Sequence, residues 1–256
     1  MTNNCKDEVN DKNNKNERKV AFITGGGVGL GKNLVEEFLK EGYFVAFTYR
    51  TEHDFVKKAK EEMSDRVLTI RADASVFDEV IMSVKKAIER FGKIDVLINN
   101  ASSTKDASLE KSTPEGFDYT IKNTLYPVYN YSKVVSEYMK NKGGKIINIG
   151  SVNGIHGREG SIGYTTAKAG IIGMTKTMAK ELGKYPINCN VVAPGYIATE
   201  GQEKTSELIK KLVLSECYIK KLSSPVEICN MVLFLASDKA NNITGQVFQV
   251  DCGQWI

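Results

Sequence analysis

Tyr164 and Lys168 lie four positions apart and carry side chains that could move a proton together. On a helix this spacing puts both on one face, within reach of a common ligand. Tyrosine alone is a poor acid or base near neutral pH, because its reference pKa is about 10. A neighbouring ammonium favours the phenolate, so we expect Lys168 to lower the pKa of Tyr164 toward neutrality.

A serine hydroxyl could complete this pair. Ser151 comes just after residues 145–149, an apolar run that is typical of a buried strand. Ligands of open α/β sheets bind at the carboxyl ends of the strands, so this hydroxyl could hold a substrate carbonyl. Tyrosine and lysine at helical spacing also occur by chance on solvated helices, and the interpretation therefore depends on the surrounding elements.

A glycine-rich turn is a second candidate for ligand binding. Residues 24–31 (TGGGVGLG) stand between an apolar strand-like run and an amphipathic helical pattern. Glycines let a backbone approach a pyrophosphate closely, and a helix N-terminus offers N–H donors and partial positive charge. We expect a dinucleotide here, with a purely structural turn as the alternative.

Short apolar runs alternate with segments of helical periodicity from Lys19 onward, the pattern of a parallel sheet with helices on both faces. Strands are expected at residues 20–24, 44–49, 67–70, 96–99, 145–149, 187–192 and 246–250. Helices are expected at residues 31–40, 55–62, 77–90, 127–140, 164–182 and 225–235. The predicted fold class is α/β, a doubly wound parallel seven-stranded sheet in one domain, residues 19–256.

Two segments are irregular. Residues 1–18 are dominated by Asn, Lys, Asp and Glu, and we expect a disordered extension. Residues 196–224 combine one short helix, at 206–214, with polar flanks. We expect a mobile lid there, with a plain surface excursion as the alternative.

The end of the second predicted strand indicates which dinucleotide binds. NAD-binding domains of this architecture usually present an acidic residue there to the ribose 2′-hydroxyl. Here Tyr49, Arg50 and Thr51 come first, and no carboxylate appears before Glu52. A guanidinium can bond a 2′-phosphate in bidentate fashion. We therefore expect NADP(H), with Arg50 and Thr51 on the 2′-phosphate, and a solvated strand end as the alternative for Arg50.

Taken together, the motifs resemble those of the short-chain dehydrogenase/reductase family from Lys19 to Ile256. The resemblance implies a single-domain Rossmann fold and hydride transfer between a nicotinamide and a carbonyl or secondary alcohol, with no metal. The segments that carry it are residues 24–31, 72–74, 99–101, Asn123, Ser151, Tyr164 with Lys168, 190–195 and 243–246.

The resemblance also implies roles for single residues. Tyr164 would donate or accept the proton, Lys168 would lower its pKa and bond the nicotinamide ribose, and Ser151 would orient the carbonyl. Asn123 would hold a water between Lys168 and solvent. Asp73, Asn99 and Asn123 have a local backbone hydrogen bond as their alternative. The expected dinucleotide contacts are Thr24, Gly25, Gly27, Val28, Gly29, Leu30, Tyr49, Arg50, Thr51, Asp73, Ala74, Asn99, Ala101, Tyr164, Lys168, Pro194, Gly195, Ile197 and Thr199.

Within the family the chain is most similar to 3-oxoacyl-(acyl-carrier-protein) reductases, through residues 99–106, 148–151, 191–195 and 243–246. Those enzymes hold the acidic carrier protein with arginines on two helices, where Ser136 and Lys180 stand here. This difference weakens the case for a carrier-protein partner. Steroid, sugar, polyol and small ketone substrates stay open, so a hydroxysteroid dehydrogenase is an alternative.

Two interpretations without catalysis are also open. One is an NADP(H)-sensing scaffold, against which the intact set Asn123, Ser151, Tyr164 and Lys168 argues. The other is a module whose helices at 127–140 and 164–182 serve only assembly. The family packs these helices into oligomers, so we expect a homodimer or homotetramer alongside catalysis. His156 is interpreted as a loop histidine without a catalytic duty.

Composition argues against several other classes of protein. The net charge is +4 with no basic stripe, so nucleic acid is not an expected partner. No run approaches the ~18 apolar residues that span a bilayer, and the start lacks the apolar run of a signal peptide. The five cysteines are widely spaced and suggest no metal site. We expect a cytoplasmic protein with reduced thiols and a small-molecule substrate.

Overall fold

The computed structural model describes residues 18–198 and 207–256. Its centre is one sheet of seven parallel strands in the order β3-β2-β1-β4-β5-β6-β7, which confirms the predicted α/β fold. Strand order reverses between β1 and β4, and open α/β sheets bind ligands at such a reversal, outside the carboxyl ends of the strands. The strands are β1 (Val20–Ile23), β2 (Phe44–Tyr49), β3 (Val67–Arg71), β4 (Val96–Asn99), β5 (Gly144–Ile149), β6 (Ile187–Pro194) and β7 (Val247–Val250).

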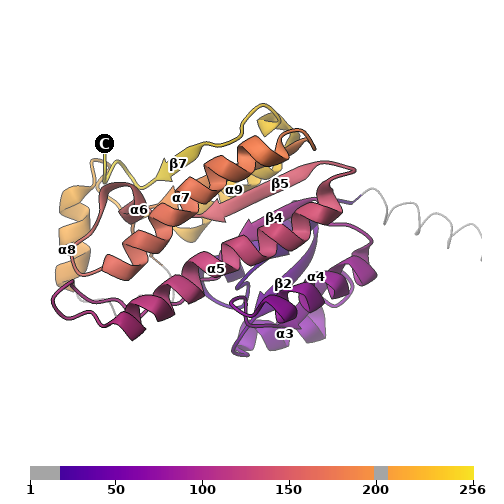
Figure 1. Cartoon of the computed structure of the whole chain (residues 1–256), viewed down its shortest axis with the longest axis horizontal. Helices are drawn as coiled ribbons and strands as arrows, with labels where there is room; N and C mark the ends of the chain where they lie inside the picture. Colours follow the sequence, from indigo (N-terminus) through magenta and orange to yellow (C-terminus); the bar gives the residue numbers. More distant parts are fainter. Residues whose placement is uncertain (1–17, 199–206) are drawn as a thin grey trace, which may run out of the picture.

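Helices cover both faces of the sheet. In Figure 1 the long helices α5 and α7 run side by side in front of it, while α9 lies behind it. Helix α4 shares a core with α5 and α7, and helices α2 and α3 share the opposite core with α9. The helices are α2 (Gly29–Lys40), α3 (Asp54–Glu62), α4 (Phe77–Phe91), α5 (Pro114–Met139), α6 (Asn153–His156), α7 (Ile162–Leu182), α8 (Glu207–Glu216) and α9 (Pro225–Ala236).

The central strands are buried on both sides, which explains why they read as continuous apolar runs rather than alternating ones. Every residue of β1 and of β2 is buried. Phe22 packs with Tyr131 of α5 on one face, and Phe47 packs with Phe55 of α3 on the other. The two cores fix the carboxyl ends of β1, β2, β4 and β5 close together.

Helix α5 differs most from the sequence prediction. The prediction began a helix at Pro127, a residue type that is common in the first helical turn. The helix in fact begins at Pro114, after Thr113, whose side chain accepts a hydrogen bond from the Gly116 backbone N–H, and Pro127 lies inside it. A proline within a helix leaves the carbonyl four residues earlier without its helical partner, here that of Asn123.

Smaller differences concern the ends of elements. β6 continues through Pro194, beyond its predicted end at residue 192, and short helix α6 was not predicted at all. The predicted helix at 206–214 corresponds to α8. Residues 1–17 of the predicted extension and 199–206 of the predicted lid lie outside the described residues. Within residues 18–198 and 207–256, no helix combines the length and the apolar character that a bilayer crossing needs.

A buried polar ladder ties the sheet to α5 and α7 beneath the carboxyl ends of β4 and β5. The side-chain amide of Asn99 donates to Asn148 Oδ1 (2.8 Å) and to Ser132 Oγ (3.1 Å). Asn148 Nδ2 in turn donates to Thr175 Oγ1 (2.8 Å), whose hydroxyl donates to the Ile171 carbonyl. These hydrogen bonds fix the backbone just before Asn100 on one strand and Ser151 on the next.

Removing one hydrogen bond of this ladder, between Asn148 and Thr175, is expected to destabilise the fold. Thr175→Val keeps the shape of the side chain but leaves the fully buried Asn148 amide without an acceptor. The expected loss is ~1–3 kcal/mol in the free energy of unfolding, measured by urea denaturation. Thr177 makes the same bond to its own helix but is exposed. Thr177→Val should therefore stay within ~0.5 kcal/mol of wild type, and equal effects of the two variants would refute the ladder's contribution.

Candidate active site

The glycine turn between β1 and α2 is packed so closely that side chains do not fit. Gly25 has a φ of +66°, a conformation that favours glycine. A Cβ on Gly31 would lie 2.0 Å from the Gly25 carbonyl oxygen. Helix α2 starts after Val28 with no side-chain cap and no acidic residue in its first turn. Its N–H donors are therefore available to an anion at this point.

Thr24 and Asn100 hold this turn against the end of β4. Thr24 Oγ1 accepts from the backbone N–H groups of Asn100 and Ala101, each at 2.9 Å. The side-chain amide of Asn100 donates to the Gly25 carbonyl oxygen at 3.1 Å. Asn99, one of the expected dinucleotide contacts, points its side chain into the interior, where it forms the ladder described above. The successive side chains of a strand face opposite ways, so Asn100 takes the lining position.

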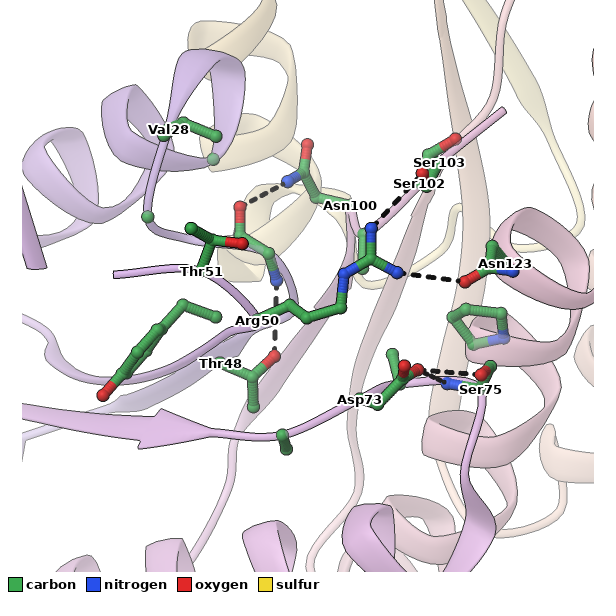
Figure 2. A pocket seen from close by; sticks show the side chains of 18 of the residues that line it. Val28, Thr48, Arg50, Thr51, Asp73, Ser75, Asn100, Ser102, Ser103 and Asn123 are labelled. Carbon is green, nitrogen blue, oxygen red and sulfur yellow. Dashed lines mark hydrogen bonds between the residues drawn. The ribbon is translucent and has the colours of Figure 1, made fainter. Parts of the chain in front are cut away.

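A pocket opens beside the glycine turn and collects most of the predicted dinucleotide contacts (Figure 2). Asp73 forms part of its wall, and its carboxylate also accepts from the N–H and hydroxyl of Ser75, as in an Asx turn. Thr24 and Gly29 do not line the pocket. The predicted residues that do are Gly25, Gly27, Val28, Leu30, Tyr49, Arg50, Thr51, Asp73, Ala74, Ala101 and Asn123.

Arg50 is exposed, and its side chain extends across the mouth of this pocket. Figure 2 shows its side chain reaching from the end of β2 toward Ser103 and Asn123. Nη1 donates to Asn123 Oδ1 (3.2 Å) and Nη2 donates to Ser103 Oγ (3.4 Å). The pocket therefore contains a guanidinium bonded to neutral partners.

A second cavity, of about 590 Å³, contains the side chains singled out for proton transfer. Ser151 comes from the end of β5, and Tyr164 and Lys168 come from the first turns of α7. Pro194, Gly195 and Ile197 line the same cavity, and Thr199 lies outside the described residues. Three residues, Leu30, Asn100 and Ser102, line both cavities. The two spaces are thus neighbours along the carboxyl edge of the sheet.

The electrostatics of the Tyr164–Lys168 pair differ from the expectation. Burial raises the pKa of Tyr164, a side-chain hydrogen bond with Ser151 lowers it, and the Asp106 carboxylate raises it. Lys168 is not among these influences; its Nζ donates to the Ile149 carbonyl (2.7 Å) and lies 5.5 Å from the centre of the Tyr164 ring. The expected net lowering of the Tyr164 pKa toward neutrality is therefore wrong for this geometry, because burial raises this pKa.

Burial disfavours the charged form of Lys168. Among residues 18–198 and 207–256 no carboxylate bonds it, and burial lowers its pKa to about 8 from 10.5. A lysine with a lower pKa in the folded chain binds fewer protons there than in the unfolded chain between these two pH values. The free energy of unfolding contributed by this group therefore rises as pH increases from about 8 to 10.5.

Replacing Lys168 should consequently stabilise the fold while removing a site residue. Lys168→Met is expected to raise the melting temperature at pH 7, with the gain shrinking as pH passes through about 8 and approaches 10.5. The measurement is thermal unfolding of both proteins across this pH range. Lys176→Met, on an exposed position of the same helix, is the matched control and should leave the melting temperature and its pH profile unchanged. A destabilised Lys168→Met protein would contradict this account.

Asn123 lines the pocket beside the glycine turn and not the cavity of Tyr164. Its side chain accepts from Arg50 and donates to the Tyr119 carbonyl (2.8 Å). Pro127 leaves the Asn123 carbonyl without a helical partner, and the Ser103 backbone N–H donates to it at 3.3 Å. The bridging water expected at Asn123 stays a prediction.

Sequence reasoning missed several polar residues of the Tyr164 cavity, among them Asp106, Arg158 and Gln254. Asp106 accepts from the Tyr164 backbone N–H (2.9 Å) and so caps α7 from a separate loop. Arg158 and Gln254 also line the cavity, and both bond Glu216 of α8 (3.1 and 2.6 Å). Asp106 ends the segment 99–106 that resembles reductases, but Arg158 and Gln254 belong to no motif, because the three residues are brought together from distant parts of the chain.

Comparison with known proteins defines the class of protein to which this fold belongs. A family model described as enoyl-(acyl carrier protein) reductase matches residues 26–254. With this match and the relatives below, the chain belongs to the short-chain dehydrogenase/reductase family of oxidoreductases.

Individual relatives are reductases of acyl thioesters by name. The chain is 39% identical to the 3-oxoacyl-(acyl-carrier-protein) reductase FabG of Thermotoga maritima, over 93% of this chain and 98% of that protein. It is 36% identical to the protein of the same name from Staphylococcus epidermidis, over 93% and 99%. It is 35% identical to the acetoacetyl-CoA reductase of Shinella zoogloeoides, over 93% and 99%.

Proposed function

We propose that this protein is an NADP(H)-dependent ketoreductase that reduces the carbonyl of a 3-oxoacyl thioester to a secondary alcohol. The observation that carries the proposal is the junction of the two cavities. Ser151, Tyr164 and Lys168 line one cavity, which adjoins the pocket of the glycine turn at Leu30 and Asn100. A dinucleotide held by the turn would then extend its nicotinamide toward these side chains.

The residues of the pocket fit a phosphorylated dinucleotide. The close packing at Gly31 and the uncapped start of α2 suit a pyrophosphate. Arg50 and Thr51 lie at the far wall, where a 2′-phosphate would find a guanidinium and no carboxylate on the strand end. We assign the NADP(H) preference to Arg50 and Thr51, and the ribose contact to Lys168.

The chemistry depends on two kinds of transfer. A bound reduced nicotinamide supplies the hydride that is added to the carbonyl carbon. Ser151 and Tyr164 bind the carbonyl oxygen and polarise it, and the Tyr164 phenol donates the proton that this oxygen takes up. Because burial raises the pKa of Tyr164, the phenol is protonated near neutral pH, which favours the direction of reduction. Asp106 fixes the start of α7 and with it the position of Tyr164.

The substrate class is proposed from the relatives and from the wall of the cavity. Helix α8 contributes Ile209, Leu212 and Val213 to it, a surface that suits an acyl chain. Ser136 is buried and bonds the Lys133 carbonyl, so it offers no cation to a carrier protein. We therefore propose that a small thioester such as a coenzyme A ester is accepted, and that contacts with a carrier protein add little to the kcat/KM.

The proposal also covers the oligomeric state of the protein and its location in the cell. Exposed Tyr129 and partly buried Met174 line a cavity between α5 and α7. We propose that this face forms a homodimer or homotetramer. The cysteines at 189, 217, 229 and 252 are free thiols, which is compatible with the reducing cytoplasm that we propose as the location.

The direct test is a steady-state assay that follows oxidation of the reduced nicotinamide. We expect turnover of acetoacetyl-coenzyme A, with a KM for NADPH at least ~10-fold below that for NADH, because the phosphate gains a charge-assisted bond to Arg50. Carrier-protein thioesters should give a kcat/KM within a few-fold of the coenzyme A ester. Equal KM values for the two cofactors would refute the NADP(H) assignment, and turnover of steroids or sugars alone would refute the substrate class.

A further inference from the structure

The dinucleotide pocket is crossed by one side chain that bonds both of its walls. Arg50 leaves the end of β2, and its guanidinium donates to Ser103 Oγ and to Asn123 Oδ1 on the opposite side (Figure 2). Asp73, Ala74 and Ala101 line the same pocket. The guanidinium therefore occupies space between walls that an adenosine must enter.

A third residue stabilises this arrangement. The Tyr119 hydroxyl of α5 is 3.0 Å from Ser103 Oγ, and its pKa is lowered by hydrogen bonds from Ser103 and from Arg50. The positive charges of Arg50 and Lys105 lower it further, and Lys105 Nζ lies 4.7 Å from the centre of the Tyr119 ring. Ser103 and Tyr119 thus orient the acceptor that holds Arg50.

We propose that Arg50, held by Ser103, Tyr119 and Asn123, bridges the dinucleotide pocket, that any bound dinucleotide must open this bridge, and that only a 2′-phosphate gives the guanidinium a replacement partner. The inference builds on the proposed use of NADP(H) and assigns Ser103 and Tyr119 as positioning residues for cofactor choice.

The relative strengths of the bonds explain the selectivity. In the bridge the guanidinium bonds an exposed amide oxygen and a hydroxyl, both of them neutral. A phosphate dianion offers charge-assisted and bidentate bonds, which are roughly twice as strong as neutral ones. The bonds to the 2′-phosphate of NADP(H) thus offset the free energy needed to break the two Arg50 hydrogen bonds. NAD(H) must break the same bonds and forms no replacement. A ligand shifts such an equilibrium only by its differential affinity for the two states.

The first test measures dissociation constants for NADPH and NADH by nucleotide fluorescence. Ser103→Ala removes one end of the bridge without touching the phosphate contact. Both constants should therefore fall, by about five-fold, the change expected for one net hydrogen bond. Ser112→Ala removes a serine bond in the same loop, to the Leu109 carbonyl, and should change neither constant. Unchanged constants in Ser103→Ala would overturn the bridge.

Arg50→Met separates the two roles of the arginine. NADPH should bind at least ~10-fold more weakly because its phosphate partner is lost. NADH should bind several-fold more tightly because nothing closes the pocket. An arginine that only bonds the phosphate predicts no change for NADH, and this result would contradict the bridge.

These outcomes also distinguish a failure of the bridge from a failure of the NADP(H) assignment. Tighter binding of both nucleotides in Ser103→Ala, with no preference for NADPH in wild type, would support a bridge that must open, but would refute the NADP(H) assignment and the 2′-phosphate as the replacement partner of Arg50. A wild-type preference for NADPH with no effect of Ser103→Ala would support the NADP(H) assignment and refute the bridge.

The second test follows the Tyr119 hydroxyl and needs no turnover. Phenolate absorbance is titrated in wild type and in Tyr119→Phe, and the difference isolates this tyrosine. Without dinucleotide, Tyr119 should titrate below its ordinary pKa. Saturating NADP⁺ should raise the pKa of Tyr119 as the Arg50 side chain moves away from it. In Arg50→Met the pKa of Tyr119 should already be higher without dinucleotide, and NADP⁺ should change it little. A Tyr119 titration that NADP⁺ does not move would overturn the proposal.

Discussion

Tyr164→Phe is expected to lower kcat by ~10²–10⁴-fold while leaving the dissociation constant for NADPH within a few-fold of wild type. The substitution removes only the hydroxyl that is placed with Ser151 and Lys168 in the cavity of about 590 Å³. Phenylalanine keeps the partly buried ring, so the fold should be retained. The measurement is a steady-state assay with acetoacetyl-coenzyme A, paired with nucleotide fluorescence.

The control for this variant is Tyr138→Phe, which removes the hydroxyl of an exposed tyrosine on α5. It should leave kcat at the wild-type value. Near-normal turnover in Tyr164→Phe would rule out the phenol as the proton donor. Loss of NADPH binding in the same protein would instead show that the hydroxyl acts in cofactor binding.

Gly31→Ala should give the largest effect on cofactor binding. The new Cβ would lie 2.0 Å from the Gly25 carbonyl oxygen and 2.7 Å from Asn100 Nδ2, two atoms that bond each other across the turn. Since neither can retreat without breaking that bond, the turn must open. We expect a loss of ~1–3 kcal/mol in the free energy of unfolding and at least ~10-fold weaker NADPH binding.

A glycine in open space provides the comparison. Gly173 is exposed on α7, and a Cβ there would meet nothing within 4 Å. Alanine in a helix is more favourable than glycine by ~0.5–1 kcal/mol, so Gly173→Ala should be slightly stabilising and bind NADPH normally. If Gly31→Ala behaved in the same way, the close packing of the turn would not be what positions the dinucleotide.

The sequence predicted the elements whose residues repeat with a clear period. Strand β2 is apolar except for Thr48 and has the predicted bounds. The four-residue spacing of Tyr164 and Lys168 does place both side chains on α7 in one cavity. Such patterns are local, and the structure of each segment follows from them. The start of α5 was missed because Pro127 marks a helix start in sequence statistics, whereas here a long helix continues through it.

The site could be predicted only where its residues belong to a motif. The roles of Asn99 and Asn100 depend on which side chain of the strand faces the glycine turn, and nothing in the motif itself specifies that. The direction of the Tyr164 pKa depends on burial and on Asp106, which approaches from another loop. The path of Arg50 across the pocket depends likewise on Ser103, which lies far from it in the sequence.

The most direct test of the central claim follows a label from cofactor to product. NADPH that carries deuterium at the transferable position of nicotinamide C4 is incubated with acetoacetyl-coenzyme A, and the product is analysed by mass spectrometry. The account predicts one deuterium on the new carbinol carbon of the product, with the added oxygen-bound proton exchanging with solvent. A reduced product that contains no deuterium, or no product from a protein that binds NADPH, would contradict it.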